Sequence, residues 1–96
     1  MAAYVLVEVS VTDREKMMPY IEAVDATVTN HGGRYLVRSP DAEVIEGNIG
    51  QHPLKVLLEF PDMAKAKAWY ASSEYQAIIP FRTDNSVGNM LFVEGE

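Results

Sequence analysis

The chain has 96 residues, of which 48% are hydrophobic and 23% charged, an ordinary composition for one globular domain spanning residues 1–96. Fourteen acidic against eight basic residues give a formal charge of −6, which argues against a nucleic-acid or anionic-membrane partner, because both are bound by clustered lysine and arginine. The absence of cysteine excludes disulfides, thiolate metal sites and cysteine nucleophiles.

The first third of the chain predicts a strand, a helix and a second strand. Residues 3–11 are rich in β-branched side chains and too short for a buried helix, so we expect a strand. Thr12 to Glu15 then has the form of a capping box. Apolar residues recur at helical spacing after it: Met17, Ile21, Val24 and Val28.

Pro19 leaves two starts open for this helix, because proline lacks the N–H that a helix interior needs. The helix starts either near Met18, with Pro19 in its first turn, or near Asp13, with a kink. The glycines at 32 and 33 supply a left-handed cap at its end. Residues 34–38 form the second strand.

The middle of the chain is a connection followed by a central strand. After the turn residues at 39–42, residues 43–46 are expected to form a small second arm, and 47–53 a polar loop. Residues 54–60 are mostly apolar, as a central strand should be.

The last third predicts two helical segments and a final strand. Pro61 and Asp62 cap a helix over 63–71, and residues 73–76 resemble a second capping box, opening a short helix that Pro80 terminates. A polar connection over 82–89 leads to a strand over 90–93. The order is β-α-β-β-α-β, an α+β, ferredoxin-like arrangement with a four-stranded antiparallel sheet and helices on one face.

Alternation along the strands divides their side chains between two faces of the sheet. One set is almost wholly apolar and belongs under the helices: Val5, Val7, Val9, Tyr35, Val37, Val56, Leu58 and Phe60. The other set is half apolar and half charged: Tyr4, Leu6, Glu8, Arg34, Leu36, Arg38, Lys55, Leu57 and Glu59. That mixture is unusual for a face left to water.

The register of the strands sharpens this pattern. We expect Leu57 to lie opposite Leu36 and Leu6, which makes two rows of three residues: Tyr4, Glu59 and Arg34, and Glu8, Lys55 and Arg38. Opposite charges then meet around a leucine stripe, as in a homodimer interface. The interface candidates are Glu8, Arg34, Arg38, Lys55, Leu57 and Glu59; a solvated face or a catalytic set are the alternatives.

The two histidines do not predict a metal site. His31 and His52 lie in separate loops, without metal-ligand spacing or a carboxylate cluster. His31 is expected beside a helix C-terminus, where the helix dipole favours its cationic form. The alternative is that His31 acts as a base or contacts a ligand. His52 is expected to be solvated. No phosphate loop or nucleophile elbow occurs, and no bound cofactor is expected.

Aromatic residues are the more suggestive group. We expect five of them to gather between helices and sheet: Tyr20, Tyr35, Trp69, Tyr70 and Tyr75. Arg82 could lean over such a pocket and bind a carboxylate or enolate. The alternative is a closed aromatic core with Arg82 solvated or paired. The candidates for ligand binding are His31, Tyr35, Tyr70, Tyr75 and Arg82.

Six short motifs in this order resemble a small bacterial family of unknown function, DUF1330. They begin with Gly33 to Arg38 and Glu43 to Gly47, continue with Leu58-Glu59-Phe60-Pro61, and close with Ala68-Trp69-Tyr70, Ser73 to Gln76 and Val93-Glu94-Gly95. The resemblance implies a dimeric α/β barrel, in which two ferredoxin-like sheets face each other. That superfamily includes cofactor-free monooxygenases, lactone isomerases, haem-degrading enzymes and ligand-binding domains, and no catalytic residue can be transferred from it.

Two functions remain open at this point. The first is a cofactor-independent enzyme, monooxygenase- or isomerase-like, acting on a small organic molecule in a pocket of each protomer. The second is a non-catalytic homodimeric module that binds a small ligand or serves in stress. A signal peptide and a membrane-spanning run of about 20 apolar residues are both missing, so we expect a soluble, cytoplasmic protein. The leucine stripe favours a homodimer in either case.

Overall fold

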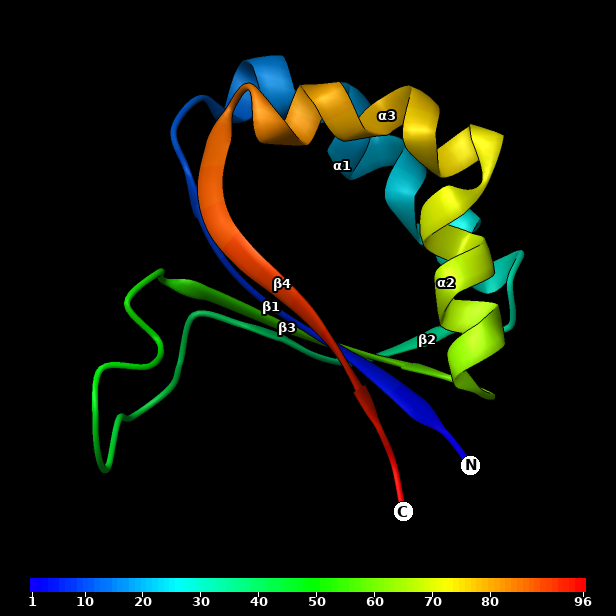
Figure 1. Cartoon of the computed structure of the whole chain (residues 1–96). Helices are drawn as coiled ribbons and strands as arrows, with labels where there is room; N and C mark the ends of the chain where they lie inside the picture. The colour runs from blue at the N-terminus through cyan, green and yellow to red at the C-terminus, as the bar shows by residue number, and fades with distance from the viewer.

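Four strands and three helices make up the computed structural model, which describes residues 1–96. In chain order they are β1 (Ala3–Val11), α1 (Arg14–Thr29), β2 (Arg34–Ser39), β3 (Leu54–Phe60), α2 (Met63–Ala71), α3 (Ser73–Thr83) and β4 (Ser86–Glu94). The strands form one antiparallel sheet in the order β2-β3-β1-β4. All three helices lie on one side of it, and the connection from β2 to β3 extends toward the other side (Figure 1). The predicted ferredoxin-like fold is confirmed.

The start of α1 settles the alternatives that Pro19 had left open. Asp13 is the N-cap, and its side chain accepts a hydrogen bond from the N–H of Lys16 at 3.1 Å. The predicted role of Thr12 in a capping box is therefore wrong. Pro19 lies inside the helix on an exposed turn, where water can reach the Glu15 carbonyl that proline leaves without its usual donor. Gly32, with φ of +77°, follows the helix end as predicted.

Three sequence expectations for the C-terminal third are corrected. The N-cap of α3 is Ser72, which accepts from the N–H of Tyr75 at 3.2 Å, and the helix continues through Pro80 to Thr83. Pro80 is exposed, and so is Gln76, whose carbonyl would otherwise receive the missing bond. Strand β4 begins at Ser86, four residues before the predicted Met90, because the long β1 offers it backbone partners as far as Val11.

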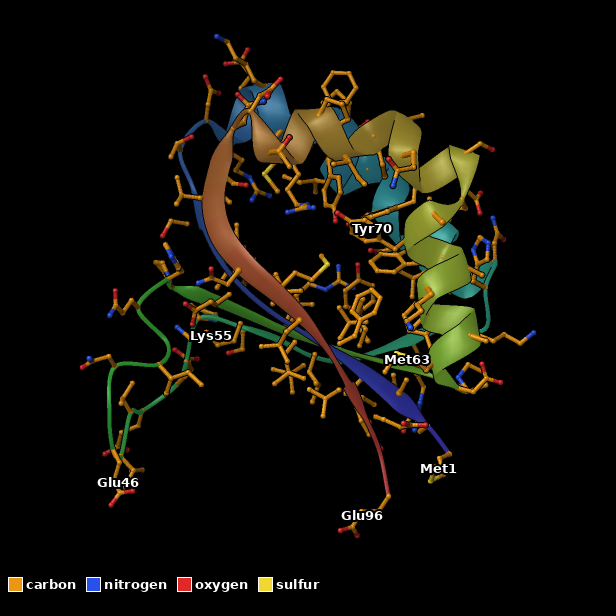
Figure 2. The ribbon with its side chains drawn as sticks, viewed as in Figure 1. Met1, Glu46, Lys55, Met63, Tyr70 and Glu96 are labelled. Carbon is orange, nitrogen blue, oxygen red and sulfur yellow. The ribbon has the colours of Figure 1, made fainter.

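The predicted small arm over residues 43–46 is also absent. These residues are part of an exposed connection, residues 40–53, without regular structure. Lys55 at its end donates hydrogen bonds to the carbonyls of Gly50 at 3.0 Å and Pro53 at 3.2 Å, and to that of His52. The second half of the connection is thus tied back to β3, and Lys55 lies at its base (Figure 2).

The core lies between the sheet and the helices, as alternation along β1 and β3 predicted. Phe60, Trp69 and Tyr75 are its largest fully buried side chains. The ring centres of Trp69 and Tyr75 lie 4.1 Å apart, and those of Phe60 and Trp69 5.4 Å apart. Burial of each such side chain contributes roughly 1.5–3 kcal/mol, and the aromatic set therefore joins α2 and α3 to β3.

The strand register agrees with the prediction over three strands and departs from it in one place. Leu6 pairs with Leu57, and Glu59 pairs with Tyr4 on one side and Arg34 on the other. A β-bulge at Leu36 then shifts the end of β2, so that Val37, not Leu36, lies opposite Leu57. The extra residue reverses the faces beyond it.

Arg38 is the residue most affected by this bulge. It pairs with Val56 in place of the predicted Lys55, which now faces Ser39. Its guanidinium lies on the helix side, 3.6 Å from the ring centre of Tyr35 and 3.3 Å from the Asp25 carboxylate of α1. The predicted place of Arg38 in a charged row on the open face is therefore wrong.

Candidate functional site: a cavity between helices and sheet

A cavity of about 320 Å³ lies between α1 and the sheet and reaches Trp69 and Arg82. Thirteen of its sixteen lining residues are hydrophobic or aromatic, and the other three are arginines: Arg14, Arg38 and Arg82. No aspartate, glutamate or histidine lines it. The cavity therefore combines an apolar wall with positive charge, which is the general form of a small-molecule site.

Its three arginines come from three separate elements. Arg14 is the first residue of α1, Arg82 lies in the last turn of α3, and Arg38 is next to the end of β2. The N–H of Thr12 donates to the carbonyl of Asn85 at 2.9 Å, which holds the start of α1 beside the end of α3. Arg14 and Arg38 are exposed and Arg82 is half-buried, so Arg82 is the inner of the three charges.

The Arg82 side chain is the unusual feature of this cavity. Its Nε is buried and has no hydrogen-bond partner, and its guanidinium carbon lies 5.5 Å from the ring centre of Tyr20. A buried donor without a partner costs about 1–3 kcal/mol, and such groups are rare in native proteins. Arg82 thus retains an unsatisfied charged donor next to an empty volume.

Two tyrosine hydroxyls form a pair behind this arginine. The hydroxyl oxygens of Tyr20 and Tyr75 lie 2.8 Å apart and buried. Burial raises the pKa of both side chains, and for Tyr20 the neighbouring Tyr75 raises the pKa further. Both are therefore neutral phenols at physiological pH, able to donate a hydrogen bond but not to act as phenolate bases.

Tyr35 contributes a third phenol to the cavity wall. Burial raises the pKa of its side chain well above the usual value near 10, and the Asp25 carboxylate raises this pKa further. The Arg38 cation lowers it by a smaller amount. Tyr35 is neutral as well. The polar part of the cavity wall accordingly consists of fixed cations and neutral hydrogen-bond donors.

The structure brings together only some of the residues that the sequence singled out. Tyr35 and Arg82 line the cavity, and Tyr75 reaches it through its bond to Tyr20. Tyr70 does not line it: its ring packs 5.6 Å from that of Tyr75 and 6.1 Å from that of Phe92, and 37% of the residue is exposed. It lies on the helix side of the sheet (Figure 2).

His31 lies away from the cavity, at the C-terminal end of α1. Its Nδ1 donates to the carbonyl of Thr27 at 2.9 Å and lies 3.3 Å from a carboxylate oxygen of Glu74. These contacts join α1 to the start of α3. His31 is not placed to touch a ligand in the cavity.

Three of the polar lining residues were not among the predicted ligand candidates. Tyr20 was named only as one of the five gathered aromatics, Arg14 belonged to a predicted helix cap, and Arg38 was placed on the wrong face. The helical period from Met17 to Tyr20 and Val24 signals that Tyr20 faces the sheet. No pattern in the sequence signals the bulge that reorients Arg38.

The face of the sheet opposite the helices carries an apolar stripe across all four strands. Leu91, Leu6, Leu57 and Val37 lie in one paired row, and Leu6, Val37 and Leu91 are 39%, 41% and 52% exposed. A hollow of about 780 Å³ lies over this stripe, bounded by residues 48–52 of the connection. We call this surface the open face.

Charged residues flank the stripe on both sides, but only one of the expected ion pairs forms. Arg34 donates to Glu59 at 2.8 Å. Glu8 and Lys55 are opposite each other, as predicted, yet Glu8 accepts from Asn89 at 3.0 Å while Lys55 bonds to the connection. The predicted ion pair between Glu8 and Lys55 is therefore replaced by hydrogen bonds of each residue to neutral groups.

Ser10 and His52 form an unexpected contact at the margin of the open face. The Ser10 hydroxyl and the Nδ1 of His52 lie 2.8 Å apart. His52, expected to be solvated, is half-buried and helps hold the connection against β1. No carboxylate bonds to the ring, so the pair lacks the third member that orients the base in a catalytic triad.

No group of three or more potential ligand side chains lies close enough together to bind a metal ion. None of the helices has the length and hydrophobicity needed to cross a membrane.

The strand order, with helices on one face of an antiparallel sheet, defines a ferredoxin-like α+β protein. The family model of the domain of unknown function DUF1330 matches residues 2–96, so the chain belongs to that family. No curated protein matches the chain significantly.

Several solved structures share this fold. RPA0582 of Rhodopseudomonas palustris, a protein of unknown function, is 14% identical over 94% of this chain and 80% of its own, with a TM-score of 0.71. A dimeric ferredoxin-like protein of unknown function from Jannaschia sp. CCS1 is 17% identical over 95% of this chain and 98% of its own, with a TM-score of 0.65. SnoaB of Streptomyces nogalater, a cofactor-independent oxygenase, is 7% identical over 99% of this chain and 93% of its own, with a TM-score of 0.64. At these identities the likeness concerns the fold alone.

Proposed function

We propose that this protein is a cofactor-independent enzyme, monooxygenase- or isomerase-like, that acts on a small organic molecule in the cavity between helices and sheet. The observation that carries the proposal is the unpartnered, buried Nε of Arg82 beside an apolar cavity of about 320 Å³. The fold of SnoaB, a cofactor-independent oxygenase, supports it by analogy.

The chemistry available in the cavity favours reactions that pass through an anion on the substrate. A guanidinium and neutral phenols can stabilise an enolate or phenolate in a largely apolar surrounding, where such interactions are stronger than in water. Arg82 is the cation for that charge. Tyr35, and Tyr20 through its bond to Tyr75, supply donors that hold the substrate in place.

One observation favours the second candidate, a non-catalytic module that binds a small ligand. The cavity wall contains no carboxylate and no imidazole, so it lacks the usual general bases. A molecule bound there would meet cations and hydrogen-bond donors without a group to remove a proton. In that case the cavity recognises a ligand and leaves it unchanged.

Turnover separates the two candidates. Aromatic acids, lactones and quinones are first screened by thermal shift, and each compound that binds is incubated with the protein in air and analysed for products. An enzyme gives product that Arg82→Gln and Tyr35→Phe reduce at least about tenfold, the loss of one charged hydrogen bond. Lys67→Gln, at an exposed position of α2, is the matched control. Binding without product supports the module.

We further propose that the protein is a homodimer formed through the open face. The exposed row of Leu6, Val37 and Leu91 supports this, since contiguous apolar surface of this kind favours association. The hollow beneath residues 48–52 gives a second copy room to insert. A ferredoxin-like neighbour from Jannaschia is dimeric.

A further inference from the structure

We infer that the ligand of the cavity is an aromatic monocarboxylate, with its carboxylate bound by Arg82 and its ring against the apolar wall. This inference rests on the proposed function, because it names the substrate class of the same cavity. It follows from the positive charge of the cavity wall, from which arginines already have an ion-pair partner, and from the size of the cavity.

The charge of the cavity wall is opposite in sign to that of the chain as a whole. The protein has a formal charge of −6 and only eight lysine and arginine residues. Three of these, Arg14, Arg38 and Arg82, line the cavity, and no acidic side chain does. In an acidic protein this local excess of positive charge selects an anion.

Arg82 is free to bind such an anion, whereas Arg38 is already paired. Arg38 has the Asp25 carboxylate 3.3 Å away, but neither Arg14 nor Arg82 takes part in an ion pair. The Nε of Arg82 also lacks any hydrogen-bond partner. A carboxylate takes two parallel N–H donors from one guanidinium, and that of Arg82, in the cavity wall, has no acidic partner.

The β-bulge in β2 adds to the positive charge of the cavity. Regular alternation would place Arg38 on the open face, and the extra residue at Leu36 turns it toward the helices. There it covers Tyr35 and lies among the lining residues. Bulges of this kind commonly redirect a side chain next to a binding site.

The cavity volume and wall restrict the rest of the ligand. About 320 Å³ is at the lower end of the range of about 300–1,000 Å³ for small-molecule sites, which suits one or two fused rings. Trp69, Val56 and Leu58 offer flat and branched apolar surface. The three arginines are the only charged residues of the wall.

Trp69 makes the test direct, because it is the only tryptophan of the chain and it lines the cavity. Its fluorescence is titrated at pH 7.5 with 2-naphthoate and with the uncharged isostere 2-naphthamide. We expect the wild-type protein to bind the acid about ten- to a hundred-fold more tightly than the amide, the usual contribution of a charge-assisted hydrogen bond. Arg82→Gln abolishes this preference and Arg82→Lys keeps part of it.

The controls distinguish this inference from the proposed function. Equal binding of acid and amide overturns the anion inference and leaves the cavity as a small-molecule site. No binding of either compound overturns both. Inorganic phosphate is titrated as a third probe, and binding of phosphate without naphthoate also overturns the inference. Preference for the acid that survives in Arg82→Gln shows that another cation binds it, which equally contradicts the assignment to Arg82.

Discussion

The hydroxyl oxygens of Tyr20 and Tyr75 lie 2.8 Å apart, although 55 positions separate the two residues. The bond joins the middle of α1 to the first turn of α3 in the buried region beside the cavity. Tyr75 is the hydrogen-bond partner of the Tyr20 hydroxyl, whereas the Tyr75 hydroxyl also lies close to Arg82. The pair therefore couples the packing of two helices to the shape of the proposed site.

Removal of one member of the pair should destabilise the protein. Tyr75→Phe leaves the Tyr20 hydroxyl buried without a partner, and we expect the free energy of unfolding to fall by about 1–2 kcal/mol. Urea denaturation followed by circular dichroism measures it. Replacement of both residues by phenylalanine should cost less than the two single changes together. Tyr70→Phe, at a partly exposed residue, is the control; an equal loss there contradicts the prediction.

Alkaline pH should destabilise the fold through the buried tyrosines. Burial raises the pKa of Tyr20, Tyr35 and Tyr75 above the value near 10 of the unfolded chain, so the unfolded state loses its protons first. Below about pH 9 the contribution of these tyrosines to the free energy of unfolding does not change with pH. Above pH 10 the free energy of unfolding falls by up to about 1.4 kcal/mol per pH unit for each tyrosine.

Denaturation midpoints measured between about pH 8 and pH 11 test this dependence. The decrease should be shallower in Tyr35→Phe, which removes one of the three titrating groups without breaking the bond between Tyr20 and Tyr75. Identical pH profiles for the wild type and this variant contradict the prediction.

Replacement of Arg82 should stabilise the free protein while it removes the proposed ligand contact. Arg82→Met retains much of the apolar stem and eliminates the unpartnered Nε, so we expect a gain of about 1 kcal/mol in the free energy of unfolding. Thermal unfolding without ligand measures the effect, with Lys67→Met as the exposed control. A loss of stability instead indicates that Arg82 supports the fold. Gain of stability with loss of function is the usual signature of a binding site.

Self-association should depend on the open face. Leu91 is 52% exposed, so Leu91→Lys has little effect on the protomer but places like charges in the proposed interface. We expect the dissociation constant of the dimer to rise at least about tenfold in sedimentation velocity experiments. Phe81→Lys, at an exposed apolar residue of α3, is the matched control. A monomeric wild type at micromolar concentration contradicts the homodimer.

Gly33 should tolerate no side chain. A Cβ at this position lies 2.6 Å from Phe60 Cε1 and 2.8 Å from Val28 Cγ1, both within the core. Gly33→Ala is therefore expected to lower the free energy of unfolding by about 1–3 kcal/mol. Gly47→Ala is the comparison, since a Cβ there meets no atom within 4 Å and the cost comes from its φ of +82° alone, about 1 kcal/mol. A smaller effect at Gly33 than at Gly47 contradicts the packing argument.

The fold was predictable because its strongest signals are periodic. Alternation in β1 and β3 gave the two faces of the sheet, and the pairing of Leu6 with Leu57 followed from it. Pro80 misled and Pro19 left two helix starts open, because a helix tolerates a proline more readily where water reaches the carbonyl that the proline leaves unbonded. At both positions that carbonyl lies on an exposed turn.

The candidate site was predicted only in part, because it depends on tertiary geometry. Tyr35 and Arg82 were found from residue type and position in the predicted elements. Arg38 was missed, since a bulge depends on how two strands pair and leaves no periodic mark in either one. His31 was included for its residue type, and its bond to the Thr27 carbonyl holds it at the helix end.

The bulge at Leu36 affects both faces of the sheet. The same extra residue places Val37 in the apolar row of the open face and Arg38 in the wall of the cavity. Regular pairing of every residue of this strand, without the bulge, would exchange the faces of the two side chains, removing a cation from one surface and adding it to the other. The apolar row of the open face and the charge of the cavity wall thus both depend on a single irregular backbone position.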